Sequence, residues 1–181
     1  MNFDKLISKL MLLFKKVKTP YMLVGGFAVA VWGYPRQSLD IDIVVELTEA
    51  KIDDFLSFAS KLGFVLDKSE VDIIVKLGNR FVMELDNFRI DCWLPKSEFD
   101  KDSLKRCKKE KLFGKTLNVI GPEDLIISKL LAGRALDVED IKTVLIRQEK
   151  SINKKYLREQ SMKLNILDSL EKIINFKNEI E

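Results

Sequence analysis

Residues 24–45 read VGGFAVAVWGYPRQSLDIDIVV, and this stretch decides the fold. An apolar residue and the pair Gly25-Gly26 lead into a helix-compatible segment, after which charged residues alternate with β-branched ones. This order predicts the end of a strand, a tight turn, a helix and a second strand. Since successive side chains of a strand point to opposite faces, Asp40 and Asp42 are expected on the same face.

A third carboxylate, Asp91, lies in the middle of another β-rich segment, Phe88–Leu94. An ionised carboxylate inside a strand is costly unless it is paired or bound to a metal ion. Asp40 and Asp42 have the spacing to hold a divalent ion from one side, and a carboxylate on an adjacent strand would bridge to a second ion. Two ions held in this way can orient a triphosphate and an attacking hydroxyl, and can neutralise charge on the transferring phosphorus.

Each of these features also has a simpler interpretation. Asp40 and Asp42 would be solvent-facing if their strand lay at an edge of the sheet, and Asp91 would be an ion-pair partner if Arg89 or Lys96 lay beside it. Most glycine turns between a strand and a helix bind nothing. The combination favours a site, because backbone amides of a glycine turn at a helix N-terminus are suited to binding phosphate.

The composition of the 181-residue chain narrows the chemistry. Histidine is absent, which excludes a His base, a Ser-His-Asp triad and a His-ligated metal. Two cysteines are too few for a disulfide framework, and a net charge of +3 neither requires nor excludes a polyanionic partner. Residues 1–20 lack the uninterrupted apolar run of a signal peptide and no stretch is suited to span a bilayer, so a cytoplasmic protein without a membrane partner is expected.

Hydrophobic periodicity and turn residues predict the remaining elements. Helices are expected over residues 4–18, 27–32, 48–62, 122–132, 138–147, 154–162 and 166–176. Strands are expected over residues 21–24, 39–45, 64–66, 71–77, 80–85 and 88–94, with a hairpin over 105–120. The fold class is therefore α+β, in which residues 1–120 form a mixed sheet flanked by helices and residues 121–181 form a C-terminal α-helical region.

The segment quoted above resembles the signature of the nucleotidyltransferase superfamily, in which Gly-Gly or Gly-Ser, a helix-length spacer and Asp-x-Asp follow one another. Asp91 looks like the third carboxylate of that superfamily. The resemblance is closest to the AbiEii-like branch, whose members carry Arg and Thr or Ser shortly before the aspartate pair, matched here by Arg36 and Ser38. The matching segments extend from about Tyr21 to Leu145.

Members of the AbiEii-like branch continue into a helical region that contains a lysine, an arginine and two aspartates. Residues 121–141, GPEDLIISKLLAGRALDVEDI, supply Lys129, Arg134, Asp137 and Asp140. Simpler interpretations are open here too. Lys129 would be an exposed helical residue, and Arg134 would be the structural ion-pair partner of one of the two aspartates at helical spacing.

The resemblance implies the polymerase-β-like fold and transfer of a nucleoside monophosphate from an NTP to an acceptor hydroxyl, with Mg²⁺ or Mn²⁺ as cofactor. Catalytic and metal-binding roles fall on three carboxylates, Asp40, Asp42 and Asp91. Contacts to the NTP fall on five further residues, Gly25, Gly26, Arg36, Ser38 and Lys129. Alternatively, Arg36 would only brace the turn before its strand.

The acceptor is open at this stage. It would be an RNA such as tRNA, or a protein hydroxyl, if the chain is the toxin of a toxin–antitoxin pair, and an antitoxin protein would then be a partner. An antibiotic-modifying nucleotidyltransferase is a second enzymatic alternative. A catalytically silent nucleotide-binding module is disfavoured, because such a fold has no need to keep like charges close together. For an RNA acceptor, the basic run Lys105–Lys111 is the expected place of its phosphates.

Overall fold

The computed structural model describes residues 3–36, 40–112 and 114–178 of the chain, without the side chains of residues 176–178. Within these residues the centre is a six-stranded mixed sheet in the order β3-β4-β2-β1-β6-β5. The strands are β1 (Tyr21–Leu23), β2 (Asp40–Val45), β3 (Arg80–Leu85), β4 (Phe88–Trp93), β5 (Lys108–Leu112) and β6 (Lys115–Val119). β1 pairs antiparallel with β2 and parallel with β6, β2 is parallel to β4, and the edge strands β3 and β5 are antiparallel to their neighbours.

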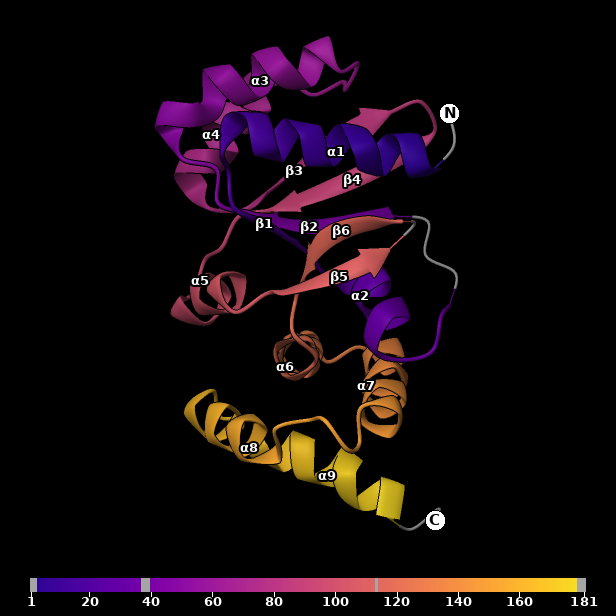
Figure 1. Cartoon of the computed structure of the whole chain (residues 1–181). Helices are drawn as coiled ribbons and strands as arrows, with labels where there is room; N and C mark the ends of the chain where they lie inside the picture. The colour runs from indigo at the N-terminus through magenta and orange to yellow at the C-terminus, as the bar shows by residue number, and fades with distance from the viewer. Residues whose placement is uncertain (1–2, 37–39, 113, 179–181) are drawn as a thin grey trace.

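Helices lie on both sides of the sheet, which confirms the predicted α+β class (Figure 1). One side carries α1 (Phe3–Val17), the 3₁₀ turn η1 (Glu49–Lys51), α3 (Ile52–Lys61) and α4 (Lys68–Leu77). The other side carries α2 (Gly25–Trp32), α5 (Glu98–Lys105), α6 (Pro122–Ala132) and α7 (Ala135–Arg147). The outermost layer consists of α8 (Lys154–Lys163) and α9 (Leu167–Asn178), which pack on α6 and α7.

The core between α1 and the sheet explains which face of β2 carries the acids. The buried stripe of α1 has helical spacing and consists of Leu6, Ile7, Leu10, Leu13, Phe14 and Val17. Phe14 stacks on Tyr21 with ring centroids 4.3 Å apart, and Tyr21 lies directly opposite Val45 of β2. Val45 therefore faces α1, and burial of each such side chain contributes about 1.5–3 kcal/mol. Strand alternation leaves both aspartates of β2 on the opposite face.

Two predicted strands are wrong. The β-branched run at residues 71–77 belongs to helix α4, because Asp67 caps its N-terminus by accepting a hydrogen bond from the amide of Glu70, and Gly78 ends it in the left-handed conformation. These local signals outweigh the β propensity of the run. At residues 64–66 the chain makes only an isolated bridge between Val65 and Glu84.

Other boundaries also differ from the predictions. The segment 48–62 is divided into η1 and α3, and Thr48 makes no side-chain capping bond. Helix α5 was not predicted, although Ser97 and Asp100 form a capping box at its start. The hairpin of β5 and β6 and the four C-terminal helices are confirmed.

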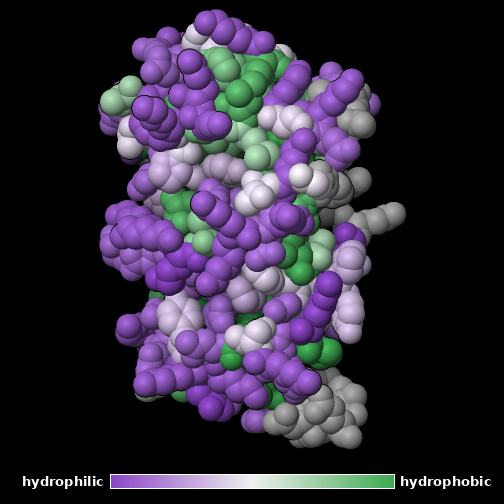
Figure 2. Space-filling view, viewed as in Figure 1, coloured by the Kyte–Doolittle hydropathy of each residue, from purple (hydrophilic) through white to green (hydrophobic). Residues whose placement is uncertain are grey.

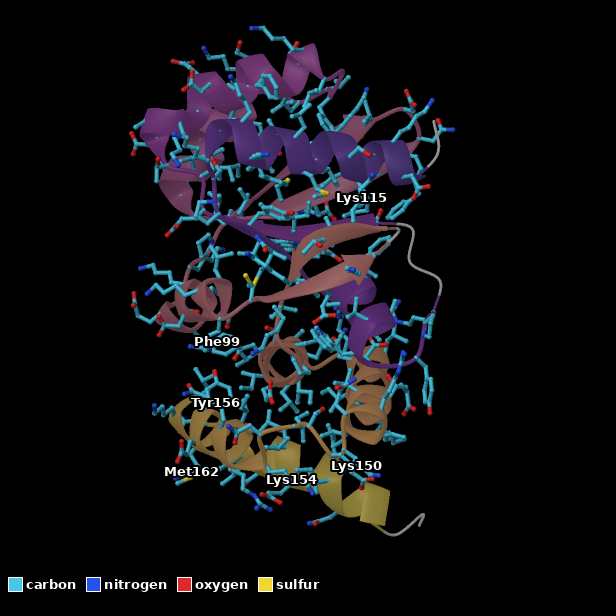
Figure 3. All side chains as sticks on the ribbon, viewed as in Figure 1. Phe99, Lys115, Lys150, Lys154, Tyr156 and Met162 are labelled. Carbon is cyan, nitrogen blue, oxygen red and sulfur yellow. The ribbon has the colours of Figure 1, made fainter. Side chains whose placement is uncertain are left out.

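A polar cluster attaches α6 and α8 to the end of α5. Arg106 donates from Nε and Nη2 to the two carboxylate oxygens of Asp124, both at 3.2 Å, and its guanidinium lies over the ring of Tyr156. The hydroxyl of Tyr156 donates to Asp124 Oδ1 at 2.6 Å. In Figure 3, Tyr156 of α8 lies on the same side of the view as Phe99 of α5. The predicted division into residues 1–120 and 121–181 stays a prediction.

No helix in the described part of the chain is long and apolar enough to cross a membrane. Charged and polar side chains cover most of the face shown in Figure 2, where apolar residues appear as small separate patches.

Candidate active site

The two strands β2 and β4 bring the predicted carboxylates together. They pair in parallel with Asp42 beside Asp91 and Asp40 beside Arg89, so all four side chains share one face of the sheet. Asp40 is exposed, Asp42 is partly buried, and Asp91 is only 7% exposed. The simpler interpretation, in which Asp40 and Asp42 lie on an edge strand, is wrong, because β2 is an inner strand.

The two inner carboxylates have different partners. Burial raises the pKa of Asp42, and the nearby charges of Asp91 and Asp40 raise it further, although a hydrogen bond from Trp93 Nε1 at 3.2 Å opposes the rise. Asp91 Oδ1 pairs with Arg80 Nη1 at 2.9 Å and with Arg89 Nε at 3.2 Å. The predicted alternative partner Arg89 is thus present, and Arg80 is an additional one.

The glycine pair lies directly beside this carboxylate face. The amide of Val24 donates to the carbonyl of Asp42 at 3.0 Å, so the turn is attached to β2. Gly25 has a φ of +58°, and a Cβ atom there would lie 2.2 Å from Asp42 Oδ2. Glycine is therefore favoured at position 25 for two reasons: its backbone is in the left-handed region, and a side chain there would collide with the Asp42 carboxylate. Gly26 is buried in the first turn of α2, where free backbone amides and the helix dipole favour an anion.

A cleft of about 510 Å³ opens between this end of the sheet and the helices α5, α6 and α7. Gly25, Asp42 and Trp93 line its sheet side, and Lys129 and Arg134 line its helical side. The rest of the lining consists of seven apolar residues, Met22, Val24, Val44, Leu94, Ile120, Leu125 and Ala132, and five polar ones, Lys96, Asp100, Ser103, Ser128 and Asp137. A concave surface that combines apolar side chains with convergent polar groups is typical of a small-molecule site.

A buried charge cluster forms the helical wall of the cleft. Lys129 Nζ donates to Asp137 at 2.9 Å and to Asp140 at 2.6 Å, and all three side chains are at most 5% exposed. Arg134 pairs with Asp137 at 2.7 Å, which confirms the predicted ion pair, and Arg36 holds Asp140 with two bonds of 2.8 and 2.9 Å. The interpretation of Lys129 as an exposed residue is wrong.

The balance of charge in this cluster shows in the pKa values of its acids. Burial opposes ionisation of Asp137, but hydrogen bonds from Arg134 and Lys129 outweigh it and lower its pKa to about 2. For Asp140, burial likewise raises the pKa, whereas hydrogen bonds from Arg36 and Lys129 lower it by more. Both acids are ionised near neutral pH and both are compensated.

The sheet face that carries Asp40, Asp42 and Asp91 has oxygen donors of the kind that divalent ions prefer. Burial, and to a smaller extent the charges of Asp91 and Asp40, raise the pKa of Asp42, and a bound cation would favour the ionised form. In the described residues, however, no three acidic or cysteine side chains are close enough to hold an ion as they stand. A metal ion would compete with Arg80 and Arg89 for Asp91.

The predicted residues thus fall into two neighbouring groups. Gly25, Asp42 and Asp91 lie together, with Gly26 and Asp40 adjacent, whereas Arg36 and Lys129 belong to the buried charge cluster. Ser38 lies outside the described residues. Sequence reasoning missed Trp93 and Arg80. Trp93 shares the strand face of Asp91 and so carried a usable signal, but Arg80 approaches only through the pairing of β3 with β4.

The structure thus brings a glycine turn at a helix N-terminus beside Asp-x-Asp, with a third aspartate on the adjacent strand, which is the arrangement expected of the nucleotidyltransferase class. The sequence matches the family described as Nucleotidyltransferase of unknown function (DUF6036) over residues 1–177. The protein therefore belongs to this nucleotidyltransferase family. No curated relative matches the sequence. The narrower AbiEii-like assignment stays a prediction.

Solved structures share the fold at low identity. The solution structure of the antibiotic-resistance factor ANT(2'')-Ia has a TM-score of 0.58 at 15% identity, covering 94% of this chain and 96% of that one. The lincosamide antibiotic adenylyltransferase LnuA, bound to lincomycin, has a TM-score of 0.53 at 18% identity, with coverages of 84% and 99%. An antigenic nucleotidyltransferase-like protein from Paracoccidioides brasiliensis has a TM-score of 0.54 at 12% identity, with coverages of 96% and 91%. These likenesses support the fold.

Proposed function

We propose that the protein transfers a nucleoside monophosphate from an NTP to an acceptor hydroxyl, and that the reaction depends on Mg²⁺ or Mn²⁺. One observation carries the proposal. The Gly25 backbone and the Asp42 carboxylate approach so closely that no side chain fits between them, and Asp91 lies beside Asp42 in register. A phosphate on the turn would therefore lie next to two carboxylates that have no evident structural need to be neighbours.

The residues of the site supply the steps of an in-line transfer. The amides at the start of α2 bind the triphosphate. Lys129, together with Arg36 and Arg134, outweighs the charge of Asp137 and Asp140 and so contributes net positive charge on the opposite wall. Asp91 accepts the proton of the acceptor hydroxyl, whose oxygen attacks the α-phosphorus while the bond to pyrophosphate breaks. Asp40, Asp42 and Asp91 would hold a divalent ion, which would neutralise charge on the phosphates. Arg36 acts through Asp140, which it shares with Lys129, to hold the helical wall of the cleft.

The biological setting is a further part of the proposal. A toxin that modifies RNA or a protein, controlled by an antitoxin, would act where NTPs are available, which is the cytoplasm. An antibiotic is an alternative acceptor, because the protein shares its fold with the antibiotic-resistance factor ANT(2'')-Ia and the lincosamide antibiotic adenylyltransferase LnuA. Induced expression of the wild-type chain and of Asp42→Asn separates these functions, because only a toxin would slow growth in an Asp42-dependent manner.

Metal and nucleotide binding give the first test. The melting temperature should rise with millimolar Mg²⁺ or Mn²⁺ and rise further with NTP, because bound ligands stabilise the folded state and the ion relieves repulsion around Asp42. The double variant Asp40→Asn/Asp42→Asn should lose this response. If the double variant responds like the wild type, the ion binds elsewhere and the proposed site is wrong.

A further inference from the structure

The face that carries Asp42 and Asp91 continues to the edge strand β3. Arg80 of β3 lies directly opposite Trp93 of β4, and Arg89 of β4 is two residues from Asp91 on the same face. β3 is an edge of the sheet, so no further strand lies beyond Arg80. The carboxylates are thus bordered by two arginines and an indole on the side away from the glycine turn.

These three side chains are attached to the carboxylates and are also open to solvent. Arg80 and Arg89 both donate to Asp91 Oδ1, and their side chains are 35% and 45% exposed. Trp93 is 39% exposed and donates to Asp42 Oδ1, while the Arg80 guanidinium lies 5.3 Å from the centre of its ring. Each group therefore has one end at the reacting carboxylates and another that a ligand can reach.

From this arrangement we propose that the acceptor is the end of an RNA strand, with its phosphates on Arg80 and Arg89 and a base on Trp93. The inference rests on the proposed function, because it names the acceptor of that same site. Guanidinium groups pair with phosphate oxygens through two parallel hydrogen bonds, and a nucleotide base of any identity can stack on an aromatic ring. A hydroxyl of the bound terminal nucleotide would then lie beside Asp91, which removes its proton.

The composition of this border favours RNA over the other acceptors. A cationic antibiotic would pair with the carboxylates and would give no role to the two guanidinium groups, whose side chains are partly exposed. A protein hydroxyl gives no role to two arginines together with an exposed indole. Their cationic and stacking surfaces are the combination that single-stranded nucleic acids bind. The earlier expectation placed RNA at the basic run Lys105–Lys111, but Arg106 there is engaged by Asp124.

The test measures binding of a labelled single-stranded RNA dodecamer with a free 3′ hydroxyl by fluorescence anisotropy, in EDTA and without NTP. In Arg80→Gln/Arg89→Gln, binding should weaken at least ~10-fold. The negative slope of log K against log salt should become shallower by roughly 1.4, at about 0.7 per lost phosphate contact. The matched control is Lys109→Gln/Lys111→Gln, which removes two exposed charges from the opposite edge strand and should weaken binding by at most ~3-fold.

A second variant distinguishes a binding role from a merely structural one. Asp91→Asn keeps the shape of the side chain but frees both guanidinium groups, so RNA should bind ~3- to 10-fold tighter. Asp53→Asn makes the same change of charge at an exposed pair with Lys68 and should leave RNA affinity within ~2-fold of wild type. If the arginines bind RNA, this gain should disappear when Asp91→Asn is combined with Arg80→Gln/Arg89→Gln, whereas a purely structural role of the arginines predicts that it persists.

The inference is overturned if the wild type does not bind the dodecamer, if the arginine variant binds like the wild type, or if the lysine variant loses as much. It is also overturned if Asp91→Asn gives no gain. The response of the arginine variant to Mg²⁺ and NTP is measured by melting in parallel. Retained NTP stabilisation with unchanged RNA binding would refute the RNA acceptor and leave the nucleotidyl transfer intact, whereas a wild type that NTP does not stabilise would refute the proposed function itself.

Discussion

Two acidic clusters face each other across the same cleft, and they differ in how their charge is balanced. Asp137 and Asp140 surround Lys129 in the buried cluster, each with an arginine as second partner, and their pKa values are lowered. Asp42 has acidic neighbours, Asp91 and Asp40, and its pKa is raised. The first cluster is arranged for stability. The second costs stability, as is expected of a cluster kept for function.

The largest expected effect comes from breaking the balanced cluster. Lys129→Met retains the length of the side chain but leaves two buried carboxylates without their shared cation. We expect the free energy of unfolding to fall by about 3–5 kcal/mol, as is typical when one partner of a buried ion pair is removed. Urea denaturation at pH 7 measures it.

Lys101→Met provides the matched control, because Lys101 pairs with Glu98 on an exposed helical surface. Its loss should change stability by no more than about 0.5 kcal/mol. Equal effects of the two substitutions would show that the buried cluster is not the stabilising element described above.

A smaller effect of opposite sign is expected in the strained cluster. Asp42→Asn removes a charge that burial and Asp91 disfavour, while the amide oxygen still accepts the bond from Trp93. Without metal at pH 7 the variant should be more stable by about 1 kcal/mol. Because the folded pKa of Asp42 is raised, the contribution of Asp42 to wild-type stability falls as pH rises above the unfolded value near 3.8 and through the folded pKa.

The advantage of Asp42→Asn should therefore vanish in acid and grow toward neutral pH, as measured by urea denaturation across that range. Asp53→Asn, an exposed acid paired with Lys68, should give a change within about 0.5 kcal/mol of zero. An Asp42→Asn variant less stable than the wild type at pH 7 would indicate that the acidic pair is not under repulsion.

The strained cluster was the more predictable of the two from sequence. Period-two alternation places Asp40 and Asp42 on one face without any tertiary information, and the same alternation places Trp93 with Asp91. The register that sets Asp42 beside Asp91 comes from the pairing of two strands separated by two helices and a third strand. Arg80 reaches Asp91 only through that assembly, so no local pattern identifies it.

The features that were predicted wrongly or missed depend on capping residues or on tertiary packing, neither of which hydrophobic periodicity reports. In α4 the run of Val71, Ile73, Ile74 and Val75 has high β propensity, and the signals that decide its conformation are the capping residues Asp67 and Gly78 at its ends. Helix α5 has few apolar residues, so hydrophobic periodicity does not predict it. The capping box at its start is the sequence signal that indicates it. Burial of Lys129 follows from the packing of α6 against α7, which its helical pattern does not specify.

The most direct test of the central claim is transfer of label from α-phosphate-labelled NTP to RNA, with NTP binding measured on the same preparations. Asp91→Asn retains the glycine turn and the Lys129 wall, so NTP should still bind. Transfer should fall by at least ~10²-fold, because a ligand charge and the proton acceptor are lost. Transfer at the wild-type rate by Asp91→Asn would contradict the account.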